Sequence, residues 1–216
     1  MRSVYLAELE ELNKKLIFMG MHCENAVAKS AQALIKMDRD IAREVVEKRE
    51  DIKKQEREIE DFCLRLLVRQ QPVAKDLRMI SSALKMVTDM ERIGDQSTDI
   101  ADIVNVCSLK KIPEGLDFKE MSDAVIHMVT KSIDAFVKQD QLVANEVIRY
   151  DDIVDNYFDS IRGKLAELLK SGANATDMLD LLMVAKYFER TGDHAANIAN
   201  WVLFSITGEL KGVHTK

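Results

Sequence analysis

The residues best suited to chemistry are carboxylates in a motif that occurs twice, as ERIGD beginning at Glu91 and as ERTGD beginning at Glu189. Side chains four residues apart share one face of a helix, so Glu91, Asp95 and Asp99 form a row. Glu189 and Asp193 form the corresponding row in the second motif. Stacked carboxylates repel each other and need either basic partners or a cation that prefers oxygen ligands. The motif therefore predicts an ion-paired helix face or a metal site.

The two motifs belong to an internal repeat. Residues 91–104 and 189–202 are identical at 7 of 14 positions, and residues 33–46 and 135–148 at 6 of 14. Each motif also has a glycine before its aspartate, although glycine costs about 1 kcal/mol in a helix interior relative to alanine. These glycines are Gly94 and Gly192. We expect each of them to allow close packing against another backbone.

Six helices are expected to position the motifs, because apolar residues recur at steps of three and four along most of the chain. The predicted helices cover about 4–37, 39–69, 73–107, 118–138, 141–170 and 177–210. In the first helix the recurring apolar residues are Leu6, Leu9, Leu12, Leu16, Met19, Val27, Ala31, Leu34 and Ile35. Pro72 ends the second helix, SGAN forms the turn before the sixth, and the polar tail after the sixth is expected to fray.

The repeat and the short turns predict an all-α fold of two tandem antiparallel three-helix bundles. The first bundle is expected at 1–107 and the second at 117–216. Residues 108–116, which contain a proline and a glycine, are the expected linker.

Composition narrows the class of protein further. Hydrophobic residues make up 47% of the chain and charged residues 31%, which is typical of long amphipathic helices. The net charge of −6 argues against nucleic acid as a partner. The cysteines Cys23, Cys63 and Cys107 are odd in number and widely spaced, so we expect buried free thiols. The N-terminus does not have the pattern of a signal peptide and no apolar run approaches about 20 residues, so a cytoplasmic protein is expected.

Other catalytic patterns are missing from the sequence. It has no glycine-rich phosphate loop, no Walker motif, no nucleophile placed beside a base, and no ExxH of the diiron type. His194 follows Asp193 and points elsewhere on the helix, which favours a packing or solvent-facing role over metal ligation. Arg92 and Arg190 are expected to pair with neighbouring acids rather than to bind an anion.

The segment QQPVAKDLRMISSALKMVTDMERIGDQSTDIADIV, at 70–104, resembles the signature stretch of the PhoU family of accessory regulators of phosphate transport. QxP, DLR and ERIGD occur in that order, and the resemblance extends over both halves of the chain. It implies two three-helix bundles, a negative regulatory role in the phosphate-starvation response and in high-affinity phosphate uptake, and multinuclear metal sites on E(D)xxxD motifs.

The resemblance also implies partners and cofactors. The partners are the ATPase subunit of the phosphate ABC transporter and the membrane sensor histidine kinase, which would bring the chain to the membrane. The cofactors are divalent or trivalent ions, with iron, zinc, manganese, magnesium and calcium all open. A homodimer is one of the oligomeric states left open. On this hypothesis the chain is a regulatory adaptor and not an enzyme.

A second hypothesis is a metal-dependent hydrolase, because all-α nucleotide pyrophosphatases also cluster carboxylates in helical bundles. Such an enzyme needs basic groups aimed at a metal-bound phosphate, together with a pocket. The sequence contains no evident constellation of that kind, which favours the adaptor.

Hairpin geometry predicts that the two motifs face side chains of opposite charge. Residues at equal height in an antiparallel hairpin have numbers with a constant sum, and the turn at 70–72 therefore places Arg49 and Lys53 beside the first motif. The family pattern has acids on the facing helix, so this half departs from it. Glu56, Glu60 and Asp102 could still supply ligands, so we expect a weakened first site.

In the second half the same geometry places acids beside acids. The turn at 171–174 brings Asp151 and Asp155 next to the second motif, and the internal repeat aligns them with Arg49 and Lys53. We therefore expect one set of carboxylates to bind metal more tightly than the other. The tighter set is Asp151, Asp155, Glu189 and Asp193, and the weaker set is Glu91, Asp95 and Asp99.

Overall fold

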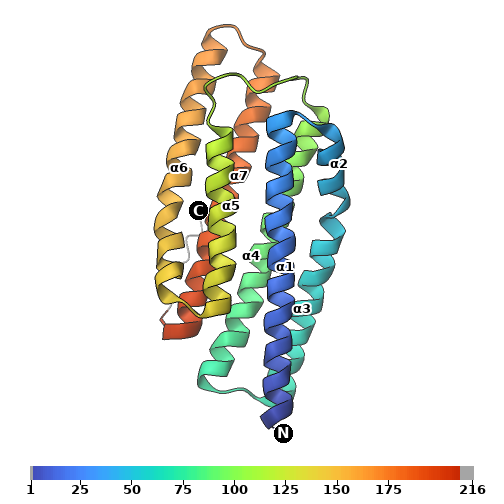
Figure 1. The fold of residues 1–216 in the computed structure, drawn as a ribbon, viewed down its shortest axis with the longest axis vertical. Helices are drawn as coiled ribbons and strands as arrows, with labels where there is room; N and C mark the ends of the chain where they lie inside the picture. Colours follow the sequence, from blue (N-terminus) through green and yellow to red (C-terminus); the bar gives the residue numbers. More distant parts are fainter. Residues whose placement is uncertain (1, 210–216) are drawn as a thin grey trace.

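The computed structural model describes residues 2–209, which form seven helices and contain no strand (Figure 1). The helices are α1 (Arg2–Lys36), α2 (Arg39–Glu47), α3 (Arg49–Gln70), α4 (Ala74–Val106), α5 (Phe118–Lys138), α6 (Gln141–Lys170) and α7 (Ala175–Thr207). The all-α prediction and the duplicated arrangement are confirmed, and five of the six predicted helices agree with the structure within a few residues. The predicted tail after the last helix, and residue 210 of that helix, lie outside the described residues.

The repeat is visible in the way that α2 and α6 begin. Asp38 Oδ1 accepts hydrogen bonds from Asp40 N at 2.9 Å and Ile41 N at 3.2 Å. Asp140 caps α6 with the same two bonds at the same two distances. The residue before each cap has a positive φ, 48° at Met37 and 49° at Gln139. The two hairpin turns are therefore copies of each other, offset by 102 residues.

The predicted second helix is wrong in one respect, because it is interrupted at Lys48. There the backbone bonds span three residues, from Lys48 N to Val45 O and from Asp51 N to Lys48 O, so the turn is tighter than an α-helix. The repeat places Lys48 opposite Tyr150, whose ring lies 4.8 Å from that of His127 on α5. Helix α6 is continuous at the half-buried Tyr150, whereas Lys48 is exposed and lies in a run of charged residues from 47 to 51.

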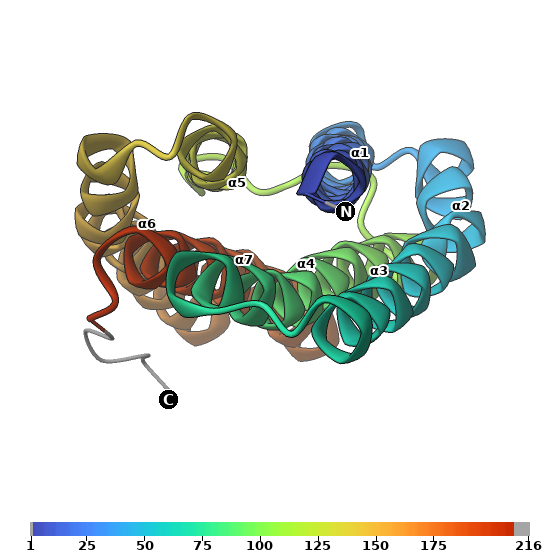
Figure 2. The ribbon, with the colours of Figure 1, turned by 90° about the horizontal axis from the view of Figure 1, so that it is seen from below.

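The helices form two layers. The helices α3, α4, α7 and α6 lie side by side in a curved layer, and α1 and α5 cover its concave face (Figure 2). Short α2 lies at the edge between α1 and α3. The broadest contact between any two helices joins α4 to α7, so the two bundles pack against each other along the helices that carry the ERxGD motifs.

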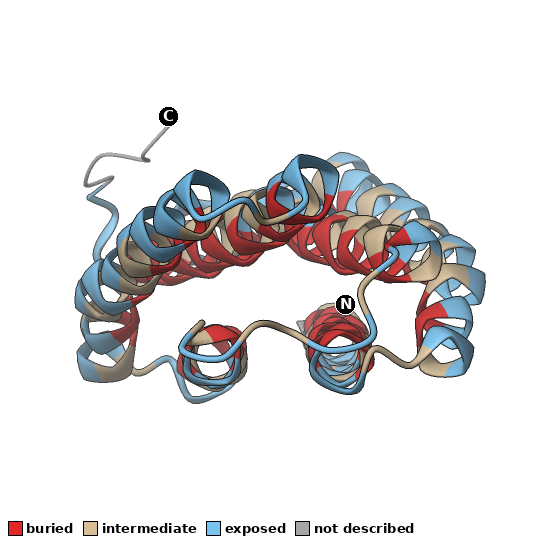
Figure 3. Ribbon diagram, turned by 90° about the horizontal axis from the view of Figure 1, so that it is seen from above, coloured by how far each residue is buried: buried red, intermediate tan, exposed pale blue. Residues whose placement is uncertain are grey.

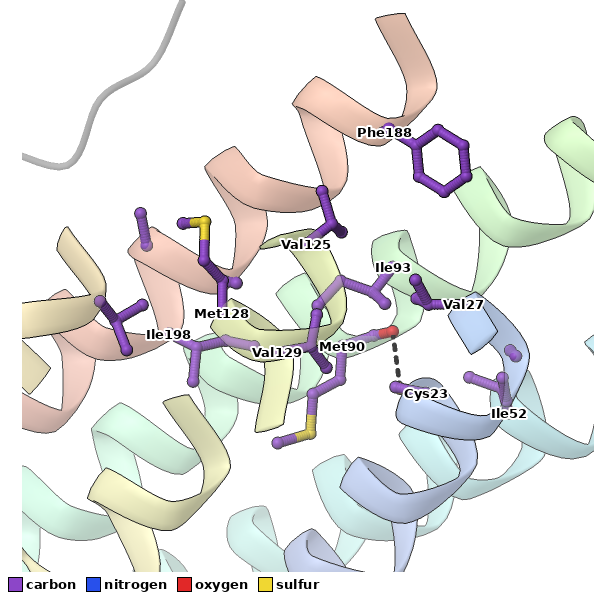
Figure 4. Close-up of a cluster of buried hydrophobic side chains, with 14 of the residues drawn as sticks. Cys23, Val27, Ile52, Met90, Ile93, Val125, Met128, Val129, Phe188 and Ile198 are labelled. Carbon is purple, nitrogen blue, oxygen red and sulfur yellow. Dashed lines mark hydrogen bonds between the residues drawn. The ribbon is translucent and has the colours of Figure 1, made fainter. Parts of the chain in front are cut away.

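Buried residues face the space between the layers, and exposed residues cover the outside (Figure 3). Side chains of both halves form one connected core, which includes Met90 and Ile93 on α4 and Met128 on α5 (Figure 4). Cys23 is buried in this core, and its thiol donates a hydrogen bond to Met90 O at 3.2 Å. Most of the recurring apolar residues of the first predicted helix are buried in α1, whereas Leu6 and Ile35 are 56% and 41% exposed.

All three cysteines are buried free thiols, as expected. The linker after α4 is held by polar contacts at its start. Arg39 Nη2 donates to Cys107 O at 2.9 Å, and the Ser108 hydroxyl donates to Asp177 Oδ1 at 2.6 Å. These bonds connect the linker to both halves. None of the described helices combines the length and the apolar character needed to cross a lipid bilayer.

Candidate functional site

The first ERxGD motif lies on α4 against two basic side chains of α3. Arg49 Nε donates to Asp95 Oδ1 at 2.9 Å. Lys53 Nζ lies 3.5 Å from the same oxygen and 3.6 Å from Glu91 Oε1. The register predicted from the hairpin turn is therefore confirmed. The side chains of Glu91 and Asp95 are only 12% and 13% exposed, so these ion pairs are partly shielded from solvent.

Arg92 closes the same cluster from the solvent side. Its guanidinium lies 3.7 Å from Glu91 Oε2 and 3.9 Å from Asp95 Oδ2, which confirms an ion pair with neighbouring acids. More than half of the Arg92 side chain is exposed. Its pairs are weaker than those made by the α3 cations, because water screens exposed charges.

Asp99 extends the acidic row toward the second half. Burial raises the pKa of its carboxyl group, and the nearby charges of Asp95 and Asp102 act in the same direction. Arg49 and Arg190 oppose this rise, and Arg190 belongs to α7. The row therefore interacts electrostatically with the second half.

Glu56, on α3, is a further acid near the first motif. Burial raises the pKa of its carboxyl group, and the nearby charges of Glu60 and Glu91 add to the rise.

The second motif lies on α7 against acids of α6. A Cβ added to Gly192 would lie 3.3 Å from Asp151 Oδ1, so the glycine leaves room for this carboxylate to approach the helix. Asp151 and Asp155 are half-buried, and each has an interaction partner. Glu189 is buried at 5% exposure, and its carboxylate is paired with Lys186 Nζ at 2.5 Å. Lys186 also lies 5.4 Å above the ring of Phe158.

The prediction that each motif glycine packs against another backbone is wrong, because both glycines pack against side chains. A Cβ at Gly94 would lie 2.9 Å from Ile52 Cδ1 and 3.0 Å from Ile52 Cγ2. At Gly192 the nearest atoms belong to the side chains of Asp151, Val154 and Met128. Both glycines therefore admit side chains of the facing helix, and in the second half one of these is a carboxylate.

The two halves fit an oxygen-bound cation to different degrees. In the second half acids lie on both α6 and α7, and Gly192 makes space for one of them, so Asp151, Asp155, Glu189 and Asp193 are the residues that would hold an ion. One of the four, Glu189, is already paired with Lys186 of its own helix. The cation would screen their mutual repulsion. The first half does not fit, because Arg49 and Lys53 already contact its carboxylates.

A third group of candidate ligands lies elsewhere. Within residues 2–209, ligand atoms of three such residues come within 4.8 Å of one another at Cys107, Asp177 and Asp180, and at neither motif. Burial raises the pKa of the Cys107 thiol, and the nearby charges of Asp177 and Asp180 add to the rise. A thiol must lose its proton to bind a metal, so this environment disfavours ligation. Asp177 instead accepts the hydroxyl of Ser108.

Sequence reasoning missed a polar contact between the motifs. His194 Nδ1 on α7 lies 2.9 Å from Asp89 Oδ1 on α4, and Asn197 Nδ2 donates to the same oxygen at 3.4 Å. His194 therefore has a partner across the interface of the two halves. No pattern in the sequence aligns α4 with α7, since these helices are not joined by a turn.

The fold and the repeated motifs define an all-helical protein in which two copies of one three-helix unit pack through their motif helices. The PhoU domain matches residues 16–104 and 118–202, one match for each copy. The chain belongs to the PhoU family.

Individual relatives agree over nearly the whole chain. The chain is 36% identical to the phosphate-specific transport system accessory protein PhoU homolog of Pseudomonas putida, covering 94% of this chain and 80% of that protein. It is 34% identical to the homolog of Clostridium acetobutylicum, covering 96% of each. The crystal structure of PhoU from Pseudomonas aeruginosa superposes with a TM-score of 0.88 at 33% identity, covering 95% of this chain and all of that one.

The fold is also shared with a solved structure whose sequence is less similar. The phosphate transport system regulatory protein PhoU from Streptococcus pneumoniae superposes with a TM-score of 0.91 at 25% identity, covering 96% of this chain and 99% of that one. Relatives are thus named as accessory or regulatory proteins of phosphate transport. This supports a regulatory role in phosphate transport for the family to which the chain belongs.

Proposed function

We propose that the chain is a negative regulator of high-affinity phosphate uptake and of the phosphate-starvation response. It acts in the cytoplasm as an adaptor between the ATPase subunit of the phosphate ABC transporter and a sensor histidine kinase. The observation that carries the proposal is the PhoU domain match in both halves, together with relatives named as accessory proteins of the phosphate-specific transport system.

The structure supports an adaptor whose shape responds to a bound cation. Both acidic rows lie on α4 and α7, the two helices that make the broadest contact in the chain. A cation bound beside one of these helices would change the charge next to the interface of the two halves. Such a change can favour one arrangement of the halves over another, and a partner can read the difference.

The hydrolase alternative has less support. It requires a free basic group that can be aimed at a metal-bound phosphate. The basic residues of α3 and α7 that contact the motif carboxylates, Arg49, Lys53 and Lys186, are engaged by Asp95, Glu91 and Glu189. Arg92, within the first motif, is paired with Glu91 and Asp95. We therefore propose that the chain is not an enzyme. Steady release of phosphate or pyrophosphate from nucleotides by the Mn²⁺-loaded protein, lost in Glu189→Gln, would contradict this.

The adaptor proposal is tested by capturing partners from membranes of phosphate-replete cells with the tagged full-length chain. We expect mass spectrometry to identify the transporter ATPase subunit and a sensor histidine kinase. Treatment with chelator should reduce their recovery, as should Asp193→Asn. The matched control is Asp152→Asn, which removes an exposed acid beside Asp151. Recovery of neither partner from any sample would contradict the proposal.

A further inference from the structure

Arg49 and Lys53 hold the positions that correspond to acids of the second half. The caps Asp38 and Asp140 and the side chains that contact the motif glycines, Ile52 and Val154, are all related by the same offset. This offset places Arg49 opposite Asp151, and it places the lysine four residues later opposite Asp155. The two halves therefore place these positions in the same register against the motif but carry opposite charges there, although the first half is interrupted at Lys48 and α6 is continuous.

The cations of the first half converge on one carboxylate oxygen of the motif, Asp95 Oδ1. Arg49 Nε lies 2.9 Å from Asp95 Oδ1, and Lys53 Nζ lies 3.5 Å from it. Lys53 also lies 3.6 Å from Glu91 Oε1, so its ammonium group bridges the two motif carboxylates. A metal ion bound to the same oxygen at about 2.0 to 2.6 Å would lie directly beside two positive charges. Both side chains would have to leave before it could bind.

We propose that Arg49 and Lys53 replace the metal ion in the first half, so that only the second half of this chain responds to metal. This inference deepens the proposed function. Its statement about the second half rests on the metal binding proposed there. The ion pairs of Glu91 and Asp95 hold α3 against α4 at any metal concentration. The first half thus acts as a fixed reference, and binding in the second half makes the molecule asymmetric.

The decisive experiment converts the first half into a copy of the second. The full-length double variant Arg49→Asp/Lys53→Asp is stripped of metal, loaded with Mn²⁺ and desalted, and its Mn²⁺ content is measured by mass spectrometry. We expect one more Mn²⁺ per chain than in the unmodified protein, and we expect Asp95→Asn to abolish the gain. The matched control, Lys54→Asp/Arg57→Asp, makes the same charge change at exposed positions of α3 and should add none.

Single variants of the unmodified protein provide an independent measurement that does not need the double variant to fold. Asp193→Asn should lower the Mn²⁺ content, whereas Asp95→Asn should leave it unchanged. Loss of Mn²⁺ in Asp95→Asn would overturn the inference. So would a folded Arg49→Asp/Lys53→Asp variant, with helical circular dichroism like that of the control, that holds no more Mn²⁺ than the control.

The outcomes also separate this inference from the proposed function. If the unmodified chain binds no Mn²⁺ but the double variant does, metal binding in the second half is wrong and the inference about the first half stands. If the unmodified chain binds Mn²⁺ through Asp95, the inference fails while the metal-binding adaptor survives.

Discussion

Asp89 Oδ1 on α4 lies 2.9 Å from His194 Nδ1 on α7, so a polar pair joins the two halves within their broadest interface. Both side chains are largely buried, at 14% and 18% exposure. Asn197 donates to the same oxygen of Asp89. A pair in this position couples the packing of one motif helix to that of the other.

Removing either member of this pair should destabilise the protein. We expect Asp89→Ala and His194→Ala each to lower the free energy of unfolding by about 1–3 kcal/mol, because each leaves a largely buried polar group without its main partner. The double variant should cost less than the sum of the two, as chemical denaturation would show. Thr88→Ala is the control, since Thr88 donates to Leu84 O within α4. Additive effects would show that the pair contributes no coupling.

Gly94→Ala should destabilise the first half although alanine favours a helix. The new methyl group would lie 2.9 Å from Ile52 Cδ1, and crowding in a packed interior costs about 1–3 kcal/mol. Ile52→Ala should relieve this cost in the double variant. Gly163→Ala is the matched control, because nothing lies within 4 Å of its added Cβ. It should raise the thermal midpoint through a gain of about 1 kcal/mol in helix propensity. Equal shifts for both variants would contradict the close approach of Ile52.

The buried thiols should make stability fall at alkaline pH. Burial raises the pKa of Cys23 from 9.0 to about 12, and it raises the pKa of Cys63 to about 12 as well. The unfolded chain therefore loses these protons first, and the folded state is disfavoured as pH rises from about 9 toward about 12. Urea titrations at several pH values should show this slope, and Cys23→Ala should reduce it. An unchanged slope in Cys23→Ala would show that this thiol does not cause it.

The bond from Ser108 to Asp177 should hold the linker in place. Ser108→Ala leaves the buried Asp177 carboxylate without this donor, and we expect a loss of about 1–3 kcal/mol in unfolding free energy. Limited proteolysis within 108–116 should also become faster. Ser171→Ala is the control, because the exposed Ser171 hydroxyl donates to Glu167 O at the end of its own helix. Equal protection of the linker in both variants would argue against this role for Ser108.

The sequence by itself determined the class of fold, the repeat and the register inside each hairpin. Apolar periodicity predicts helices because each helix must bury one stripe, and short turns make consecutive helices neighbours. The number of residues in a hairpin then dictates which residues lie at equal height. The pairing of Arg49 with Asp95 could therefore be predicted, as could the approach of Asp151 to Gly192.

Features that depend on contacts between segments far apart in the chain were decided only by the tertiary structure. The interruption at Lys48 is not visible in the helical pattern of residues 39–69, and the corresponding Tyr150 of the continuous α6 contacts His127 on another helix. The pairing of His194 with Asp89 depends on how the two halves dock, which no turn constrains. Ser108 and Asp177 likewise meet through packing of segments far apart in the chain. Local patterns carry propensity and spacing, whereas docking is set by the combined burial of many side chains from both halves.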